Sequence, residues 1–423
     1  MMTDIDHPQR YALVNELHAR PSPRLSAPCE AVYLAFKEPR DAASRDRARD
    51  RAHLAALTGE AVGDDATHDM RQMGGAVIRW ESYAEFVSYT AFRDGLTQPP
   101  FDPAQAAIFP EDWQAVAPGK RLASVLVRVE DMPEDPGAVD ARISDWFSAD
   151  SLTAATAIDG AAIIATDFRI DPAGHMRFAV FVRPGTGPGR IGRIVQRLLE
   201  IETYRAMAML GLKRARDVTA RLNAIEPELA ALVEHMADQS RPSEATLHDL
   251  LGISARLESL AMQLSFRFGA TPAYEAIVHD RIRGLREERF AGRQTFDEFM
   301  SRRFEPAMRT VRSAERRLQA MIERAARAGE LLGTRVDVER AAQNQNLLES
   351  MDARADLQLR LQETVEGLSV VAISYYAVSL AGYLLYPLAK PLHISKEVML
   401  AGIVPLVVIC VWLMVRHIKN RIH

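Results

Sequence analysis

The chain has 423 residues, of which 48% are hydrophobic and 26% charged, and its formal net charge is −4. This length allows two or three folded units, each with its own core. The mixed, weakly negative charge provides no basic face of the kind that binds nucleic acid, so no nucleic-acid partner is expected. Two cysteines, Cys29 and Cys410, are too few for a zinc or iron–sulfur site, and nothing in the sequence pairs them as a disulfide.

The amino terminus lacks an apolar stretch, so no signal peptide is predicted. Residues 1–186 are expected to form a cytosolic α+β domain with a mixed or antiparallel sheet, because several strands are joined by short turns such as DPAG. An arginine-rich segment, 39–57, has a helical pattern. Strands are predicted by apolar runs or alternation at 29–37, 75–82, 85–92, 121–130, 160–170 and 175–183.

Residues 187–333 are predicted to form a helical domain. Apolar residues recur at helical spacing from Ile191 onward, and further helices are expected at 244–267 and 273–290. No proline occurs between Pro306 and Pro387, and Gly329 and Gly333 are expected to divide this stretch into two helices. The second would contain a stalk, 334–366, and would measure about 84 Å by Ala389 at 1.5 Å per residue.

Two apolar segments without charge close the chain. Residues 367–389 and 398–415 are each long enough to cross a bilayer, and the polar link 390–397 is so short that they must form a hairpin. A basic tail, 416–423, follows. The positive-inside rule then places both termini in the cytoplasm, which predicts a protein that spans a membrane twice.

A glycine-rich loop separates the two soluble domains. Gly187, Gly189 and Gly192 have the GxGxxG spacing after a predicted strand. A dinucleotide fold would next need a short helix and a second parallel strand, whereas here the predicted helix continues. We interpret the loop as a helix start flanked by Arg190 and Arg193, with anion binding at the helix amino terminus as the remaining alternative.

No pattern in the sequence predicts catalysis. The histidines lack metal-binding spacing, no nucleophile elbow is present, and no paired carboxylates stand out, so we expect neither an enzyme, a metal site nor a cofactor. The stretch HPQRYALVNELHARP, residues 7–21, is interpreted as a docking helix of the cytosolic domain that Pro21 terminates. Its polar residues remain candidates of unknown role: Asn15, Glu16, His18 and Arg20.

The first apolar segment carries a polar face. Ser369, Tyr376, Ser379 and Tyr383 follow heptad steps on one side of the helix, and Tyr386 extends them. Polar groups inside a membrane seldom face lipid, so this face predicts an oligomer interface or a pore lining. Two alternatives stay open, because a serine can bond to its own helix and tyrosines occur at membrane interfaces.

The same heptad face continues backward into the stalk. Its residues there are Asn344, Leu348, Met351, Ala355, Gln358, Gln362 and Val365, and Ala372 completes it inside the span. We expect Gln358 and Gln362 to face the axis of an oligomer. Glu363 and Glu366 would then lie near a cytosolic mouth, where carboxylates concentrate cations.

Two sequence blocks resemble the signature blocks of a bacterial family. HPQRYALVNELHARP and residues 343–376, QNQNLLESMDARADLQLRLQETVEGLSVVAISYY, are similar to those of the uncharacterized membrane-anchored proteins, domain-of-unknown-function family 3422. The resemblance covers nearly the whole chain and implies a bacterial inner-membrane protein, but the family has no assigned activity. The layout is also loosely similar to CorA-type magnesium channels, although AGYLLYPLA stands where those have Gly-Met-Asn.

Three functions are therefore carried forward. The leading hypothesis is a homo-oligomer in the lipid bilayer whose first span lines an axial path for ions or small solutes. The rival is a non-conducting anchor or scaffold whose cytosolic domain binds a protein partner. The third is a membrane-tethered enzyme that would use the loop from Gly187 to Gly192.

Overall fold

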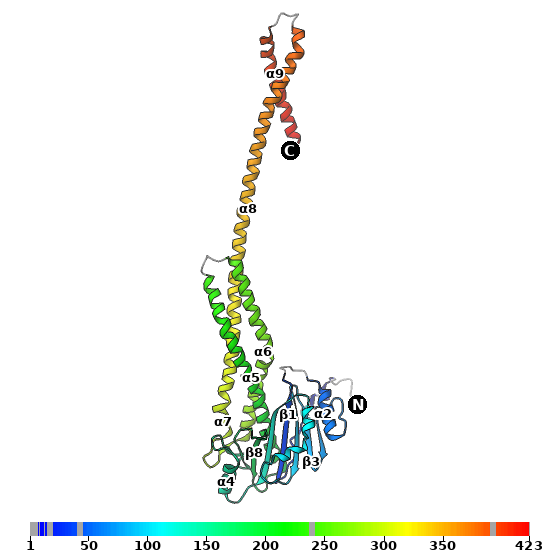
Figure 1. The fold of residues 1–423 in the computed structure, drawn as a ribbon, viewed down its shortest axis with the longest axis vertical. Helices are drawn as coiled ribbons and strands as arrows, with labels where there is room; N and C mark the ends of the chain where they lie inside the picture. The colour runs from blue at the N-terminus through cyan, green and yellow to red at the C-terminus, as the bar shows by residue number, and fades with distance from the viewer. Residues whose placement is uncertain are drawn as a thin grey trace. The chain divides into compact units, whose positions relative to one another are not determined.

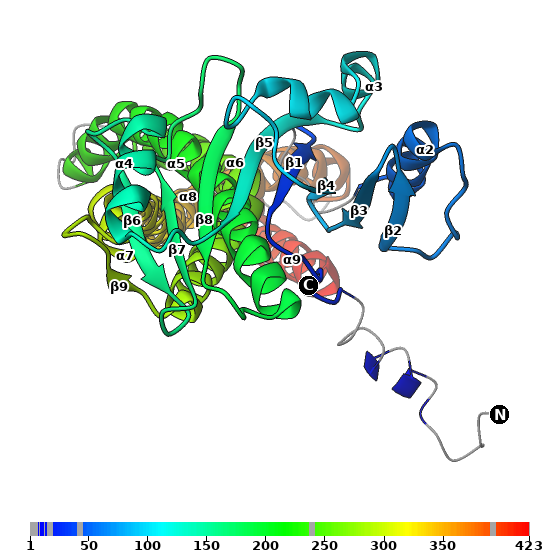
Figure 2. The same cartoon turned by 90° about the horizontal axis from the view of Figure 1, so that it is seen from below.

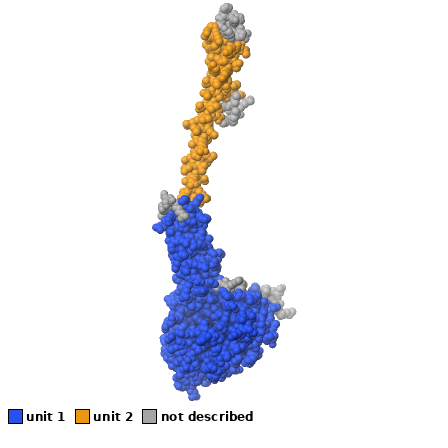
Figure 3. All heavy atoms as spheres, viewed as in Figure 1, with its two compact units in different colours: residues 1–329 blue, residues 330–423 orange. Residues whose placement is uncertain are grey.

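The computed structural model describes residues 7, 9–11, 13–14, 20–39, 45–236, 242–389 and 395–422, without the side chains of 136, 386–389 and 418–422. It divides into two compact units, residues 1–329 and 330–423 (Figure 3). The predicted fold class is confirmed: a mixed-sheet domain and long helices precede two apolar carboxy-terminal helices (Figure 1).

A nine-stranded sheet forms the centre of unit 1, in the order β2-β3-β4-β1-β5-β8-β7-β6-β9, which can be followed across Figure 2. Within it β5 and β8 pair in parallel, and the other neighbouring strands pair antiparallel. The strands are β1 Cys29–Lys37, β2 His68–Met73, β3 Ala76–Ser82, β4 Phe86–Asp94, β5 Lys120–Asp131, β6 Thr153–Ala157, β7 Ala162–Thr166, β8 Met176–Val182 and β9 Glu288–Arg289.

The sequence pattern located most of these strands but overestimated one. The strand predicted at 160–170 is only β7, because Ile158 and Asp159 before it and Phe168 after it have positive φ angles and form turns. Strand β2 was missed because, as the edge strand HDMRQM, it has few apolar residues to alternate. Strand β6, TAATA, was missed because it is short, is buried at every position except the half-buried Thr156, and contains only small residues without an alternating pattern.

One face of the sheet is covered by short helices. Leu34, Trp80 and Phe181 from the strands share a buried core with residues of α2, α3 and α4. Helix α2 begins later than predicted because the Asp46 carboxylate caps it by accepting from the amides of Ala48 and Arg49. These elements are α2 Arg47–Thr58, the 3₁₀ helix η1 Pro103–Ile108, α3 Glu111–Ala115 and α4 Pro136–Trp146.

Helix α5, Pro188–His235, packs against strands β5 and β8. Because successive residues of a strand face opposite sides, Tyr33 points away from the core that contains Leu34. Its hydroxyl accepts a 2.7 Å hydrogen bond from Thr203 of α5. The sheet is therefore enclosed between α5 and the short helices.

Helices α5, α6 (Ser243–Leu285) and the first part of α8 (Glu305–Ala389) pack together in unit 1 (Figure 1). The two helices predicted at 244–267 and 273–290 are one, so Pro272 does not end α6. The crossing with α5 supports the helix there, because Gly211 of α5 lies so close that an added Cβ would be 2.3 Å from Thr271 Oγ1. Arg286, in the left-handed region, then terminates α6.

Two short elements join α6 to α8: strand β9 and helix α7, Phe296–Arg303, which begins with a capping box between Thr295 and Glu298. The predicted helix break at Gly329 and Gly333 is wrong, because α8 is continuous through both. An isolated glycine destabilises a helix by only about 1 kcal/mol relative to alanine, and the helix-forming residues around Gly329 and Gly333 outweigh this cost. Unit 2 contains the remainder of α8 and α9, Lys396–Ile422.

Candidate functional site

Within the described residues, two helices are long and apolar enough to cross a membrane: the carboxy-terminal part of α8, and α9. Their apolar windows are only 6% buried, whereas the core helix of a soluble protein is mostly buried. This confirms the pair of apolar segments expected from the sequence. Pro405 lies inside α9 without ending it.

The two apolar helices contact each other along one side of α8. Ser374 is 6% exposed, Val411 of α9 is also 6% exposed, and a Cβ on Gly382 would lie 3.6 Å from Leu400 Cδ2. Ala381 beside Gly382 is half-buried. Small residues at this contact allow the two backbones to approach closely.

The heptad face predicted from the sequence, here called the seam, lies mainly on the opposite side of α8. At 100° per residue, Ser374 is turned well away from Ser369 and Tyr376. The side chains of Tyr376 and Tyr383 are 68% and 80% exposed. The seam consists of Asn344, Leu348, Met351, Ala355, Gln358, Gln362, Val365, Ser369, Ala372, Tyr376, Ser379 and Tyr383.

Almost the entire seam is exposed within unit 2. Residues 340–365 are all exposed, and Ser379 is the half-buried seam residue of the span. Ser379 Oγ donates a 3.0 Å hydrogen bond to the carbonyl of Tyr375, so the alternative that a serine satisfies itself on its own helix applies to this residue. Tyr386 belongs to the residues whose side chains are not described.

The acidic residues predicted near a cytosolic mouth each follow a seam position by one residue. Glu363 is exposed and Glu366 is half-buried. The Gln362 side-chain amide donates to Glu366 Oε1 over 3.2 Å, so the two residues sit one turn apart on neighbouring faces. The structure thus brings Glu366 beside the seam more directly than Glu363.

The residues that directly follow the amino-terminal motif contact the glycine-rich loop in unit 1, although the two are far apart in sequence. Arg20 lies over the ring of Tyr83 at 5.0 Å, and the amide of Leu25 donates to the carbonyl of Pro188 over 3.1 Å. The carbonyl oxygen of Pro23 sits 1.6 Å from where a Cβ of Gly192 would be. Gly192 therefore allows the chain after the motif to cross the first turn of α5.

For the other described residues of the amino-terminal motif and the glycine-rich loop, the structure shows no contact that assigns a role. Asn15, Glu16 and His18 lie outside the described residues. Tyr11 and Val14, two apolar residues of the predicted docking helix, are 53% and 51% exposed, so neither side chain is buried. Gly187 caps α5, and Arg190 and Arg193 flank its first turn, where anion binding stays a prediction.

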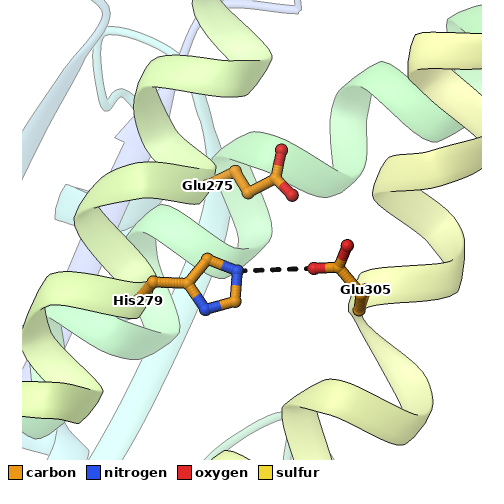
Figure 4. Close-up of side chains that lie close together, drawn as sticks. All are labelled: Glu275, His279 and Glu305. Carbon is orange, nitrogen blue, oxygen red and sulfur yellow. Dashed lines mark ion pairs between the residues drawn. The ribbon is translucent and has the colours of Figure 1, made fainter.

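One group of potential metal ligands, not anticipated from the sequence, joins α6 to α8 (Figure 4). Glu275, His279 and Glu305 each offer a ligand atom within 4.8 Å of the others, and His279 Nε2 is 3.5 Å from Glu305. However, Arg312 donates to both Glu275 oxygens at 2.5 and 2.6 Å and to Glu305 at 2.9 Å. Both carboxylates therefore already accept hydrogen bonds from one guanidinium, whose positive charge lies where a cation would bind, so the cluster fits an ion-pair contact between helices better than a metal site.

A family comparison agrees with the signature blocks. The family described as "Protein of unknown function (DUF3422)" matches residues 5–422. The chain belongs to this family. A search of curated proteins found no match, and the loose likeness to CorA-type channels gains no support. As a DUF3422 protein, the chain brings no assigned activity with its membership.

This DUF3422 protein also contains a group of buried charged residues that the sequence analysis did not predict. Glu85, just before β4, accepts from Arg267 of α6 at 2.5 Å and from the Tyr274 hydroxyl at 2.7 Å, and Lys37 lies 3.7 Å away. All three charged side chains are at most 5% exposed. Residues so far apart in sequence show no common pattern, and only the fold reveals that they meet.

A half-buried acid before α7, Glu287, predicts pH-dependent stability. Burial, and then the nearby Asp297 carboxylate, raise the pKa of Glu287 to about 7 from 4.5. The folded state therefore retains a proton that the unfolded chain loses near pH 4.5, and stability falls as pH rises from about 4.5 to 7. Glu287→Gln should remove this loss and gain about 1–3 kcal/mol over wild type at pH 8.

Thermal unfolding of the full chain in detergent, followed from pH 5 to 8, measures this difference. The melting temperatures of Glu287→Gln and wild type should be similar at pH 5 and should separate by several degrees at pH 8. Asp297→Asn is the matched control, since it removes only the secondary contribution. Parallel pH profiles for wild type and Glu287→Gln would contradict the prediction.

Proposed function

We propose that this DUF3422 protein is a bacterial inner-membrane protein, with both termini cytoplasmic, that self-associates through the seam. The first spans of several copies then surround an axial path for ions or small solutes. One observation supports this most strongly: the seam runs without a break from Asn344 to Tyr383 and is exposed, except at the half-buried Ser379, on the side that α9 leaves free.

A second copy of the same helix is the partner that fits the seam best. Copies inserted in one membrane share their orientation, so their α8 helices run parallel and place each seam residue at the same depth. A strict heptad repeat is the pattern that lets parallel helices keep one face together over many turns. Polar residues such as Tyr376 then avoid lipid by meeting their equivalents.

The width of the exposed face favours more than two copies. Leu347, Leu361 and Leu368 flank the seam on one side and are 60%, 64% and 72% exposed. Leu359 and Leu380 flank it on the other and are 58% and 67% exposed. Two helices bury a narrow stripe, whereas a wider apolar face is buried when each helix has two neighbours.

The chemistry of the enclosed path would be neutral and polar. Gln358 and Gln362 supply amides before the membrane, and Ser369 and Tyr376 supply hydroxyls within it. Glu366, beside the seam at the entrance, adds a ring of carboxylates that raises the local cation concentration. Small cations are therefore the preferred solutes of this proposal.

Paired cysteine variants test the assembly. In a background lacking Cys29 and Cys410, Tyr383→Cys should crosslink between copies with a short bis-maleimide in native membranes. Leu384→Cys, at nearly the same depth and 72% exposed, should crosslink far less because it points about 100° away. Equal crosslinking at both positions, or none at Tyr383→Cys, would refute assembly through the seam.

Flux measurements separate a path from an anchor. Purified protein in liposomes with a potassium gradient should show protein-dependent flux that Tyr376→Phe alters severalfold by removing a lining hydroxyl. The neighbouring Tyr375, 70% exposed but outside the seam, provides the matched control Tyr375→Phe. Specific crosslinking without flux would overturn the path and favour the non-conducting anchor that binds a protein partner.

A further inference from the structure

A cavity of about 380 Å³ opens in unit 1 between the turn after β7, helix α5 and the junction of α7 with α8. Its volume lies in the range of small-molecule sites, about 300–1,000 Å³. Neither the seam nor the membrane hairpin contributes to it. The residues that matter for its chemistry are Phe168, Phe299, Arg169, Arg205, Arg303 and Met209.

The apolar side of the cavity is aromatic and only partly covered. Phe168 and Phe299 stack with ring centroids 4.3 Å apart and planes 19° from parallel. Phe296 supports the stack from beneath by an edge contact with Phe168 at 5.3 Å. Because Phe296 is fully buried while Phe168 and Phe299 are half-buried, the stacked pair presents ring surface to the cavity.

The position of Phe168 is held by the backbone. Its φ of 52° is rare for a bulky residue, and its amide donates to Thr166 Oγ1 over 3.2 Å. Asp167 secures the same turn by accepting from the amides of Ser148 at 3.1 Å and Arg169 at 3.2 Å. The turn thus places an aromatic ring and the Arg169 side chain at one opening, and strained residues of this kind cluster at ligand sites.

The acids around the cavity already have basic partners. Asp167 lies 3.4 Å from Arg177, and the exposed Asp150 lies 3.7 Å from Arg169. On α5, Glu202 accepts twice from Arg205 at 2.9 Å, and burial raises the pKa of Glu202. These pairs leave no carboxylate available for a cation.

Arg303 differs from the other arginines of the cavity. Among the described residues it forms no ion pair, although it sits at the end of α7 one turn after Phe299. The guanidinium therefore provides one uncompensated positive charge next to the aromatic stack. Guanidinium groups bind carboxylates and phosphates through two parallel hydrogen bonds.

We propose that this cavity binds a small organic monoanion with a flat apolar body, such as an aromatic carboxylate. The anionic group pairs with Arg303, whose guanidinium is the one uncompensated positive charge among the described residues that line the cavity. The apolar body lies against Phe168 and Phe299, with Met209 filling the opposite wall. A metal cation is disfavoured by the excess positive charge, and an inorganic anion would leave the aromatic surface unused.

Calorimetric titration of the full chain in nanodiscs tests the proposal, with empty nanodiscs as the blank and 2-naphthoate as the probe. We expect saturable binding of one 2-naphthoate per chain, while inorganic phosphate and neutral 2-naphthol each bind far more weakly. Arg303→Gln should weaken 2-naphthoate binding about tenfold, the loss of one charge-assisted contact.

The adjacent Arg302 is the matched control. It is exposed, carries the same charge on the same helix and contacts Gln294 instead of the cavity, at 3.5 Å. Arg302→Gln should therefore bind 2-naphthoate like wild type. Equal weakening in both variants, absence of saturable binding, or phosphate binding as tight as naphthoate would each overturn the proposal. Retained melting temperatures of the variants exclude unfolding as the cause.

Discussion

Gly192→Ala is expected to destabilise unit 1 by about 3 kcal/mol, the upper part of the usual range for an overpacked site. The added Cβ would lie 1.6 Å from the carbonyl oxygen of Pro23 and 2.7 Å from its carbonyl carbon. Both atoms belong to the backbone, so no side-chain rotation relieves the clash. The chain around Pro23 must shift, which also disturbs the hydrogen bond from Leu25 to Pro188.

The matched control for this prediction is Gly189→Ala in the same turn of α5. Its Cβ would meet only the Arg193 guanidinium at 3.6 Å, an ordinary contact with a flexible side chain. Alanine is also a better helix former than glycine, so this variant should be neutral or slightly stabilising. Thermal unfolding in detergent distinguishes the two, and similar melting temperatures would contradict the close approach at Gly192.

The comparison of these glycines shows what the GxGxxG spacing does in this chain. From sequence alone the three glycines suggested a phosphate loop or a plain helix start, because both need small residues there. Position 192 requires glycine because Pro23, about 170 residues earlier in the sequence, crosses closely over it. Such a crossing has no local signal, so sequence interpretation could not have identified it.

The successful predictions rest on the periodic spacing of apolar residues along the sequence. The strand at 29–37 matches β1 residue for residue, since its buried run alternates between two covered faces. The helical character of residues 334–389 was also predicted correctly, whereas the heptad face as an interface stays a prediction. The sequence could not predict which face of α8 contacts α9. Ser374 lies at the contact and Ser369 lies on the seam, yet both are serines of the same apolar segment.

Prolines and glycines misled the prediction of helix ends. Pro272, Gly329 and Gly333 are local breakers, but α6 and α8 continue through them. Tertiary packing, as at the contact of Gly211 with Thr271, stabilises a long helix by more than a single breaker destabilises it. The metal-like group of Glu275, His279 and Glu305 was missed for a related reason, since its members converge only when α6 and α8 pack together.

Arg267→Met is expected to destabilise unit 1 by about 3–5 kcal/mol, the usual effect of removing one partner from a buried ion pair. Arg267 is fully buried, and its guanidinium donates to Glu85 at 2.5 Å. Without it the Glu85 carboxylate keeps Lys37 at 3.7 Å and the Tyr274 hydroxyl at 2.7 Å. Because of this partial compensation, we expect a destabilisation of about 3 kcal/mol, the lower end of the range. It should lower the melting temperature by about 10 °C.

A surface pair of the same chemistry is the control for this prediction. Arg256 and Glu228 join α6 to α5 at 2.6 Å, but both side chains are 49% exposed. Water screens this pair and solvates either partner when the other is removed, so Arg256→Met should change the melting temperature very little. Equal effects of Arg256→Met and Arg267→Met would show that burial does not determine the contribution of these pairs.

The double variant Glu85→Leu/Arg267→Met identifies the origin of the effect. If the loss in Arg267→Met comes from a carboxylate left in a buried site, removing that carboxylate as well should restore part of the stability. The recovery cannot be complete, because Lys37 then loses its carboxylate and Tyr274 its acceptor. A double variant less stable than the sum of the two single variants would instead indicate that packing around Arg267, between the sheet and α6, is responsible.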